Sequence, residues 1–290
     1  MNAKPRWETD GANWPHREAS RFIEAGGVRW HVQVYGSGPA ILFLHGAGAA
    51  SHSWADVGAA LERDFTIVAV DLPGHGFTST PPDARMSLAG MTAATSALLT
   101  ALNVEPDLIV GHSAGAAIMI ELIAEKLVTP RAGLSINGAL APFDGPASFL
   151  FPAMAKLLSL NPFAPSILAH GAARRDRVEQ LIKGTGSAIQ QRNIALYAAL
   201  LARPGHVAGV LRMMANWNVE GLRRKLSRLE TPVFFAAAEK DRAVPPALAA
   251  EAARLAPKGA LRSFPALGHL AHEENPVAFA TLIREIVAAH

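Results

Sequence analysis

Short apolar runs alternate with helical patterns along the first half of the chain. Two alternating runs flank Gly26-Gly27, a pair that tolerates positive φ, so residues 20–35 predict a β-hairpin. Nearly continuous apolar runs follow, and such runs are typical of strands buried on both faces of a parallel sheet. They cover 40–46, 65–71, 107–113, 131–138 and 231–241. Helical patterns separate the earlier runs, at about 53–63, 87–102 and 114–128.

This alternation predicts a doubly wound α/β fold with a mostly parallel sheet. It stops after residue 140, where helical patterning with breakers such as "NPFAP" and "RPGH" continues to Thr231 without a convincing strand. We therefore expect a helical cap, 142–228, inserted after the sixth strand of a core made of 1–141 and 229–290. A last helix is expected from about Pro276, with one apolar face made of Phe279, Leu282, Ile283 and Ile286.

One serine stands at a junction between a predicted strand and a predicted helix. Residues 110–117 read "VGHSAGAA", with Ser113 between Gly111 and Gly115. A serine on so tight a turn needs small neighbours, and the turn lifts its hydroxyl over the end of the sheet. The helix that follows also favours negative charge near its first residues. The context predicts that Ser113 is a nucleophile; the alternative is a merely tight turn.

A serine nucleophile needs a histidine as base and an acidic residue that orients the histidine. In such folds the acid follows the serine in the chain, and the histidine follows the acid. The acid should close a late strand, where "FFAAAEKD" offers Asp241, with Glu239 as a rival nearer the strand body. The histidine should follow the final strand, where "LRSFPALGHLAHEE" offers His269, with His272 as an alternative that we interpret as structural. His269 would take the serine proton while Asp241 fixes its tautomer.

Two backbone N–H groups are needed to stabilise an oxyanion. We expect one from Ala114 and the other from the loop "HGAGAAS", at Ala47. The small residues of this loop let the backbone approach the reacting oxygen. We interpret His45, His75 and His112 as packing residues of turns and strand ends.

The amino-acid composition excludes several kinds of site and predicts a cellular location. The chain has 290 residues, 50% of them hydrophobic, and no cysteine, which excludes disulfides and thiolate sites. No apolar segment resembles a signal peptide or a membrane span, so a cytoplasmic protein is expected. No histidine spacing predicts a metal site, and no glycine-rich loop predicts a nucleotide, so we expect neither metal nor cofactor.

Charge is unevenly distributed, although its net value is only +3. The segment 141–228 holds twelve Lys and Arg against four Asp and Glu, a net +8, which leaves −5 for the remainder. A basic, apolar segment suits an anionic amphiphile, peripheral contact with an acidic membrane surface or an acidic partner; the alternative is a solvated helix face. No nucleic-acid-binding motif is present.

Several motifs together resemble the α/β-hydrolase superfamily: "HGAGAASHSW", "DLPGHGFTS", "GHSAGAA", "DRAVPP" and "GHLAHEE". The resemblance implies the α/β-hydrolase fold and a Ser113–His269–Asp241 triad. A serine at the turn argues against dehalogenase and epoxide hydrolase chemistry, which needs a carboxylate. An esterase, a C–C hydrolase and a cofactor-free peroxidase would share this triad.

More narrowly, the chain is similar to the BchO-type magnesium-chelatase accessory proteins of bacteriochlorophyll synthesis. The segments that carry this similarity are 14–33, 135–143, 181–187, 213–218 and 268–274. The resemblance implies a role in inserting magnesium into protoporphyrin, with protoporphyrin or its magnesium form as ligand and magnesium chelatase as partner. A non-catalytic porphyrin-binding accessory protein is the alternative to a hydrolase. A flat apolar ring could be covered by a substrate pocket that includes Phe151, Met154, Met213 and Trp217.

Overall fold

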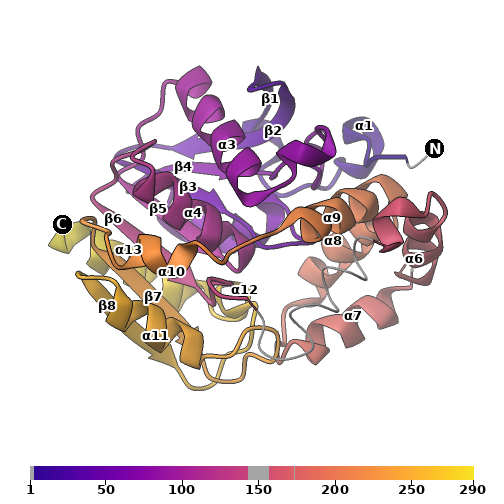
Figure 1. Cartoon of the computed structure of the whole chain (residues 1–290). Helices are drawn as coiled ribbons and strands as arrows, with labels where there is room; N and C mark the ends of the chain where they lie inside the picture. The colour runs from indigo at the N-terminus through magenta and orange to yellow at the C-terminus, as the bar shows by residue number, and fades with distance from the viewer. Residues whose placement is uncertain (1–2, 143–156, 173) are drawn as a thin grey trace.

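An eight-stranded, mostly parallel sheet runs through the computed structural model, which describes residues 3–142, 157–172 and 174–290 (Figure 1). Its strands are β1 (Ser20–Ala25), β2 (Val28–Gly36), β3 (Ala40–Leu44), β4 (Thr66–Val70), β5 (Leu108–His112), β6 (Ala132–Ile136), β7 (Val233–Ala238) and β8 (Gly259–Phe264). Their spatial order is β1-β2-β4-β3-β5-β6-β7-β8, with β2 antiparallel to both of its neighbours and all later pairs parallel. The predicted doubly wound α/β fold is confirmed.

The predicted strands and hairpin are found where the apolar pattern placed them. β1 and β2 pair across Gly26-Gly27, whose φ values of 57° and 69° explain why glycine is needed at this turn. β5 and β6 are buried along their whole length, because helices cover both faces of the central sheet. β8 lies at the edge, and its residues are half-buried or exposed.

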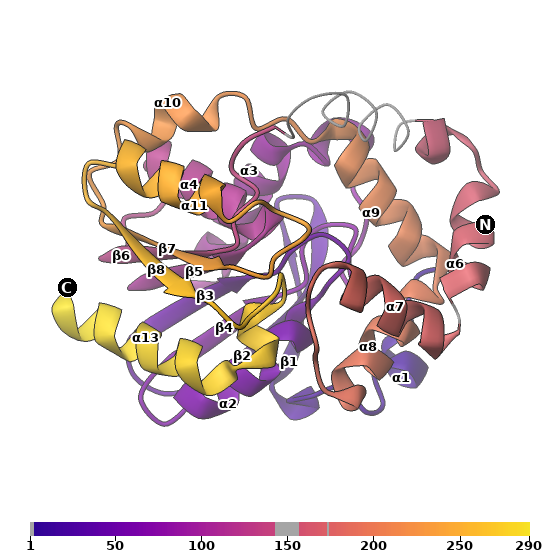
Figure 2. The same cartoon turned by 90° about the horizontal axis from the view of Figure 1, so that it is seen from below.

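Helices form a layer on each face of the sheet (Figure 2). α3 (Leu88–Leu102), α4 (Ala114–Ala124), α10 (Leu222–Leu226) and α11 (Ala247–Leu255) pack on one face. α2 (Ala55–Leu61) and α13 (Pro276–Ala289) pack on the other. The short elements are α1 (Trp7–Asp10), η1 (Arg17–Ala19), η2 (Ser51–Trp54), η3 (Asp83–Arg85) and α12 (Ala271–Glu274). All four residues predicted for the apolar face of α13 are buried.

The segment between β6 and β7 contains no strand among its described residues, as predicted. Its helices are α6 (Ala164–Ala172), α7 (Arg175–Gly184), α8 (Gln191–Leu201) and α9 (Pro204–Asn216), followed by α10. α6 to α9 gather beyond one side of the layered core, whereas α10 packs on α4 (Figures 1 and 2). Among the described helices, no single one is long and apolar enough to cross a bilayer. α8 and α9 together are long and apolar enough, but the chain bends by 85° between them.

The cap contacts the core through a buried carboxyl group. Glu273 in α12 is 2% exposed, and it accepts hydrogen bonds from Tyr197 Oη at 2.6 Å and Asn193 Nδ2 at 3.3 Å, both on α8. Burial raises the pKa of Glu273 to about 8. The carboxyl group is therefore neutral at pH 7, which lets it lie between the two layers without a cation.

We predict that Glu273→Gln becomes more stable than the wild type as pH rises. The stability supported by the neutral carboxyl is complete below its unfolded pKa of 4.5 and is lost as pH rises through about 8, whereas glutamine does not titrate. The difference in Tm should grow from pH 5 upward by roughly 2–4 °C for each kcal/mol that the wild type loses, and it should level off above about pH 8. Thermal unfolding across this pH range measures it.

Glu179→Gln, on the exposed surface of α7, is the matched control. A hydrogen bond from Lys183 lowers the pKa of Glu179, so its replacement should bring no gain between pH 5 and 9. A constant difference between Glu273→Gln and the wild type across this range would contradict a neutral Glu273.

Candidate active site

Ser113 occupies a strained turn between β5 and α4. Its φ and ψ are 51° and −115°, a conformation that non-glycine residues rarely adopt. A Cβ on Gly111 would lie 2.5 Å from Ala116 Cα, and one on Gly115 would collide with the carbonyl oxygen of Leu44. The two glycines therefore allow α4 to start directly against β5 and β3, with Ser113 half-buried at the carboxyl end of the sheet.

His269 and Asp241 form a hydrogen-bonded pair near this turn. His269 Nδ1 lies 2.8 Å from Asp241 Oδ2, and the two side chains are 12% and 1% exposed. Asp241 Oδ1 accepts from the N–H groups of Ala243 at 2.7 Å and Val244 at 2.9 Å. Because a carboxylate only accepts, Nδ1 carries the proton and His269 Nε2 is left as the basic atom.

The two rivals named from the sequence lie elsewhere. Glu239 is exposed and accepts from Ser263 Oγ at 3.2 Å. His272 is buried against Trp54, with ring centroids 4.3 Å apart, and burial lowers its pKa to about 3. Neither residue contacts the His269–Asp241 pair through a hydrogen bond within the described part of the chain.

The loop that carries His269 is held through its backbone. The His269 carbonyl oxygen accepts from His112 Nε2 at 2.9 Å and from Asn137 Nδ2 at 2.8 Å. Asn137 also accepts, through Oδ1, from the N–H of Ala238 at the end of β7. The rings of His112 and His269 are 4.7 Å apart, which brings the histidine beside the turn of Ser113. No direct hydrogen bond between the Ser113 hydroxyl and His269 is present among the described contacts.

The loop after β3 lies against the same turn. A Cβ on Gly46 would lie 3.0 Å from Ser113 Cβ, so this backbone approaches the serine closely. Ala47 is exposed, and its N–H donates to no group in the described ranges. Ala114 is the first residue of α4, so its N–H has no acceptor within the helix. Both proposed oxyanion donors are thus available at the side of the sheet where Ser113 lies.

The residues predicted for a substrate pocket fall into two groups. Phe151 and Met154 lie outside the described residues. Met213 is 1% exposed and belongs to the core cluster that includes residues of α3 and α4, and Trp217 packs against this cluster. A hollow of about 320 Å³ lies nearby between α3, α4 and α10, and neither residue lines it. The pocket assignment stays a prediction.

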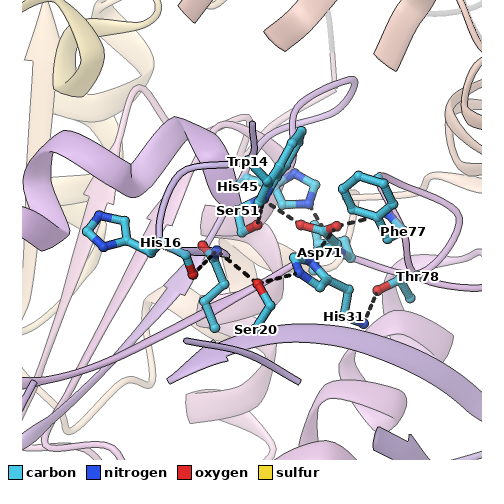
Figure 3. Close-up of polar contacts among 12 residues, drawn as sticks. Trp14, His16, Ser20, His31, His45, Ser51, Asp71, Phe77 and Thr78 are labelled. Atoms are coloured by element: carbon cyan, nitrogen blue, oxygen red, sulfur yellow. Dashed lines mark hydrogen bonds and ion pairs between the residues drawn. The ribbon is translucent and has the colours of Figure 1, made fainter. Parts of the chain in front are cut away.

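A second polar cluster surrounds the buried carboxylate of Asp71 (Figure 3). Oδ1 accepts from the N–H of Ser51 at 2.7 Å, and Oδ2 accepts from Phe77 N–H and His31 Nδ1, each at 2.9 Å. Burial alone would raise the pKa of Asp71, but His31 and these N–H groups hold it well below its usual range. An ionised Asp71 therefore ties the loop after β3 to β2 and to the loop after β4.

Ser20, His31 and Asp71 form a serine–histidine–acid chain of their own. His31 Nε2 lies 3.0 Å from Ser20 Oγ, and His31 and Asp71 are both 0% exposed. Aromatic rings of Trp7, Trp14, Phe22 and Phe77 surround His31. Because the histidine and the acid are enclosed and only Ser20 is half-buried, we interpret this cluster as structural, and residue types alone therefore do not identify an active site.

Three contributors to the site were not singled out by their sequence pattern. Asp71 is the last residue of the apolar run 65–71, and this position only weakly indicates a polar residue at the carboxyl end of a strand. Asn137 has a φ of 47°, a conformation that asparagine tolerates better than most residues. His206, on α9, gives no local signal, because its partners lie in distant loops.

Comparisons with known proteins agree with this architecture. A model of the alpha/beta hydrolase family matches residues 41–282. The chain is 40% identical over 264 residues to the magnesium-chelatase 30 kDa subunit of Rhodobacter capsulatus, covering 90% of this chain and 92% of that protein. It is 24% identical to pyrrolizixenacetamide deacetylase of Xenorhabdus hominickii, over 91% of this chain and 97% of that protein.

Among solved structures, a serine hydrolase involved in carbazole degradation superimposes with a TM-score of 0.77. The sequences are 20% identical, and the match covers 93% of this chain and 99% of that one. This likeness shows the fold, and the higher identity to the chelatase subunit confirms the narrower resemblance read from the sequence.

We predict that Asp71→Asn destabilises the protein by about 2–4 kcal/mol at pH 7, because an amide nitrogen would face a backbone N–H donor in a buried site. Urea denaturation measures the change. Since the pKa of Asp71 is lowered, its contribution is present above the unfolded pKa of 3.8 and is lost as pH falls toward the folded value. The difference from the wild type should therefore shrink only below about pH 4.

Asp64→Asn is the control for this measurement. Asp64 pairs with Arg284 at the surface, where both side chains are more than 40% exposed. Its replacement should cost at most about 1 kcal/mol. A cost for Asp71→Asn no greater than that of the control would contradict the role given to the buried carboxylate.

Proposed function

Because this chain belongs to the alpha/beta hydrolase family, we propose that it is a serine hydrolase. Its substrate is an ester or related acyl compound that is apolar and tetrapyrrole-like, and its role is linked to magnesium insertion in bacteriochlorophyll synthesis. The observation that carries the proposal is the 2.8 Å pair of His269 and Asp241 beside the strained turn of Ser113.

In the first half of the reaction, Ser113 Oγ attacks the acyl carbon while His269 Nε2 takes the hydroxyl proton. Asp241 Oδ2 accepts from Nδ1–H, so it orients the ring and stabilises the imidazolium that forms. The carbonyl π electrons move to the oxygen, where the N–H groups of Ala47 and Ala114 donate to the oxyanion. When the oxyanion collapses, the bond to the alcohol breaks and the leaving oxygen takes the proton from His269.

In the second half, water attacks the acyl-serine ester and gives a proton to His269 Nε2. The second tetrahedral intermediate uses the same N–H donors. Its collapse breaks the bond to Ser113 Oγ, which recovers the proton, and releases the acid. Each half begins with the proton of His269 on Nδ1, facing Asp241, so that Nε2 can accept the proton of the attacking group.

The substrate class rests on similarity and on charge. The related Rhodobacter protein is named a magnesium-chelatase subunit, which supports association with the chelatase and a tetrapyrrole ligand. The related Xenorhabdus protein is named a deacetylase, which supports acyl chemistry. The excess of arginine and lysine between β6 and β7 would suit the propionates of a porphyrin.

A second candidate function is that of a non-catalytic accessory protein that binds porphyrin for the chelatase. The name of the 40% identical relative favours it, because a chelatase subunit need not hydrolyse anything. The fold does not decide between the two, since function depends on the site and not on the scaffold.

We predict that Ser113→Ala lowers kcat for an aryl ester by roughly 10³-fold or more, because the nucleophile is lost. It should also abolish labelling by a fluorophosphonate. Ser20→Ala is the matched control, since Ser20 hydrogen-bonds the buried His31 of the second cluster, and it should keep both activity and labelling. Equal labelling of Ser113→Ala and the wild type would remove Ser113 as the nucleophile.

A titration with protoporphyrin, followed by visible absorbance, separates the two candidate functions when it is paired with magnesium-protoporphyrin formation. For a hydrolase, Ser113→Ala should bind porphyrin with wild-type affinity but fail to support its metallation. For an accessory protein, Ser113→Ala should both bind porphyrin with wild-type affinity and support its metallation. Absence of a spectral change at any concentration would remove the tetrapyrrole from either function.

A further inference from the structure

One buried histidine links the cap to the loop that carries Ala47. His206, near the start of α9, is 0% exposed. Its Nδ1 accepts from the N–H of Gly76 at 3.0 Å, and its Nε2 lies 3.1 Å from the carbonyl oxygen of Gly48. Because Gly76 supplies a donor and Gly48 an acceptor, the proton must be on Nε2. Burial lowers the pKa of His206 to about 3, so the ring stays in this neutral form.

The partner on the core side is the loop proposed to hold the oxyanion donor. The Gly46 carbonyl oxygen accepts from His45 Nδ1 at 2.7 Å and from the N–H of Ala49 at 3.2 Å. In a trans peptide the N–H points opposite to the C=O, so the fixed Gly46 carbonyl sets the direction of the Ala47 N–H. Gly48 follows with a φ of +82°, and a Cβ there would meet nothing within 4 Å. Conformation, and not space, therefore requires glycine at 48.

Fixing the Gly48 carbonyl completes the restraint of this loop. Within the described residues, three side chains hydrogen-bond backbone atoms of this loop: His45 at Gly46, His206 at Gly48 and Asp71 at Ser51. Two of these side chains belong to the core, and only His206 comes from the cap. Ala47 lies between the first two restraints.

The helix that carries His206 has little freedom to shift. α9 passes so close to the loop after β4 that a Cβ on Gly209 would collide with the carbonyl oxygen of Gly74. Arg212, one turn further along, pairs with Asp83. The imidazole is therefore presented to Gly48 and Gly76 from a helix whose backbone rests on the core.

We propose that His206 is a positioning residue for the reaction, which holds the oxyanion loop from the cap by donating to the Gly48 carbonyl. The inference rests on the proposed hydrolase function and deepens it. Correct placement of the cap then becomes a condition for correct placement of the Ala47 N–H, so cap and core form the oxyanion site together. A shift of one ångström at such a donor is enough to lower a rate by about 10²-fold.

Two substitutions separate the two hydrogen bonds of His206. In His206→Asn, the side-chain oxygen can take the place of Nδ1 and keep the Gly76 contact, but the donor to Gly48 is lost. In His206→Gln, the amide nitrogen reaches the place of Nε2 and keeps that donor. We expect His206→Asn to lower kcat for an aryl ester by roughly 10- to 100-fold with little change in KM. His206→Gln should stay within about threefold of the wild type.

A measurement that needs no turnover tests the same contact. Hydrogen–deuterium exchange of peptides that cover residues 45–51 should be faster in His206→Asn than in the wild type and close to wild type in His206→Gln. Val207→Ala is the control for α9, since it removes buried volume on the same turn without touching Gly48. It should lower Tm and leave kcat and the exchange of 45–51 unchanged.

The outcomes distinguish this inference from the proposed function. Equal effects of His206→Asn and His206→Gln on kcat and exchange, or a loss of kcat in Val207→Ala as large as that in His206→Asn, would overturn the positioning role. A wild-type protein that neither hydrolyses esters nor labels at Ser113 would overturn the hydrolase function. In that case the exchange comparison still decides whether His206 holds the loop.

Discussion

A buried, ionised carboxylate is the constraint around which the loops at the carboxyl end of the sheet are arranged. Asp71 is fully buried, and its charge is tolerable only because its two oxygens accept three hydrogen bonds from separate segments. Satisfying it brings together β2, the loop after β3 and the loop after β4. The loop that approaches Ser113 can therefore keep one conformation although much of it is glycine and alanine.

Neutral histidines fix further backbone segments around the candidate site. His45, His112 and His206 lie against the carbonyl oxygens of Gly46, His269 and Gly48 respectively. Burial lowers the pKa of all three, which keeps each ring uncharged, and the carbonyl oxygen that each ring faces fixes its tautomer. Through the other ring nitrogen, His45 accepts from the N–H of Leu72 and His206 accepts from that of Gly76, so each of these two rings joins two backbone segments. His269 differs, because it is partly exposed and paired with a carboxylate.

Hydrogen bonds also connect the cap to the core. Glu273 holds α8 next to the loop of His269, and His206 holds α9 next to the loop of Ala47. These two contacts join the cap to both loops of the proposed reaction site. The two proposed functions, porphyrin binding and acyl hydrolysis, therefore depend on connected parts of the molecule.

The sequence by itself determined the strands, the hairpin and the turn of Ser113, because these depend on local pattern: apolar runs, paired glycines and small residues around one serine. It also indicated Asp241 and His269, since chain order and strand ends narrow the choice. It described β8 poorly, because an edge strand with exposed residues lacks a continuous apolar run. Only the tertiary structure placed Asp71, Asn137 and His206 against the loops of the candidate site. They hydrogen-bond to backbone atoms of segments far away in the chain. Every residue type except proline carries the same backbone N–H and carbonyl groups, so the sequence does not indicate which of them will be partners.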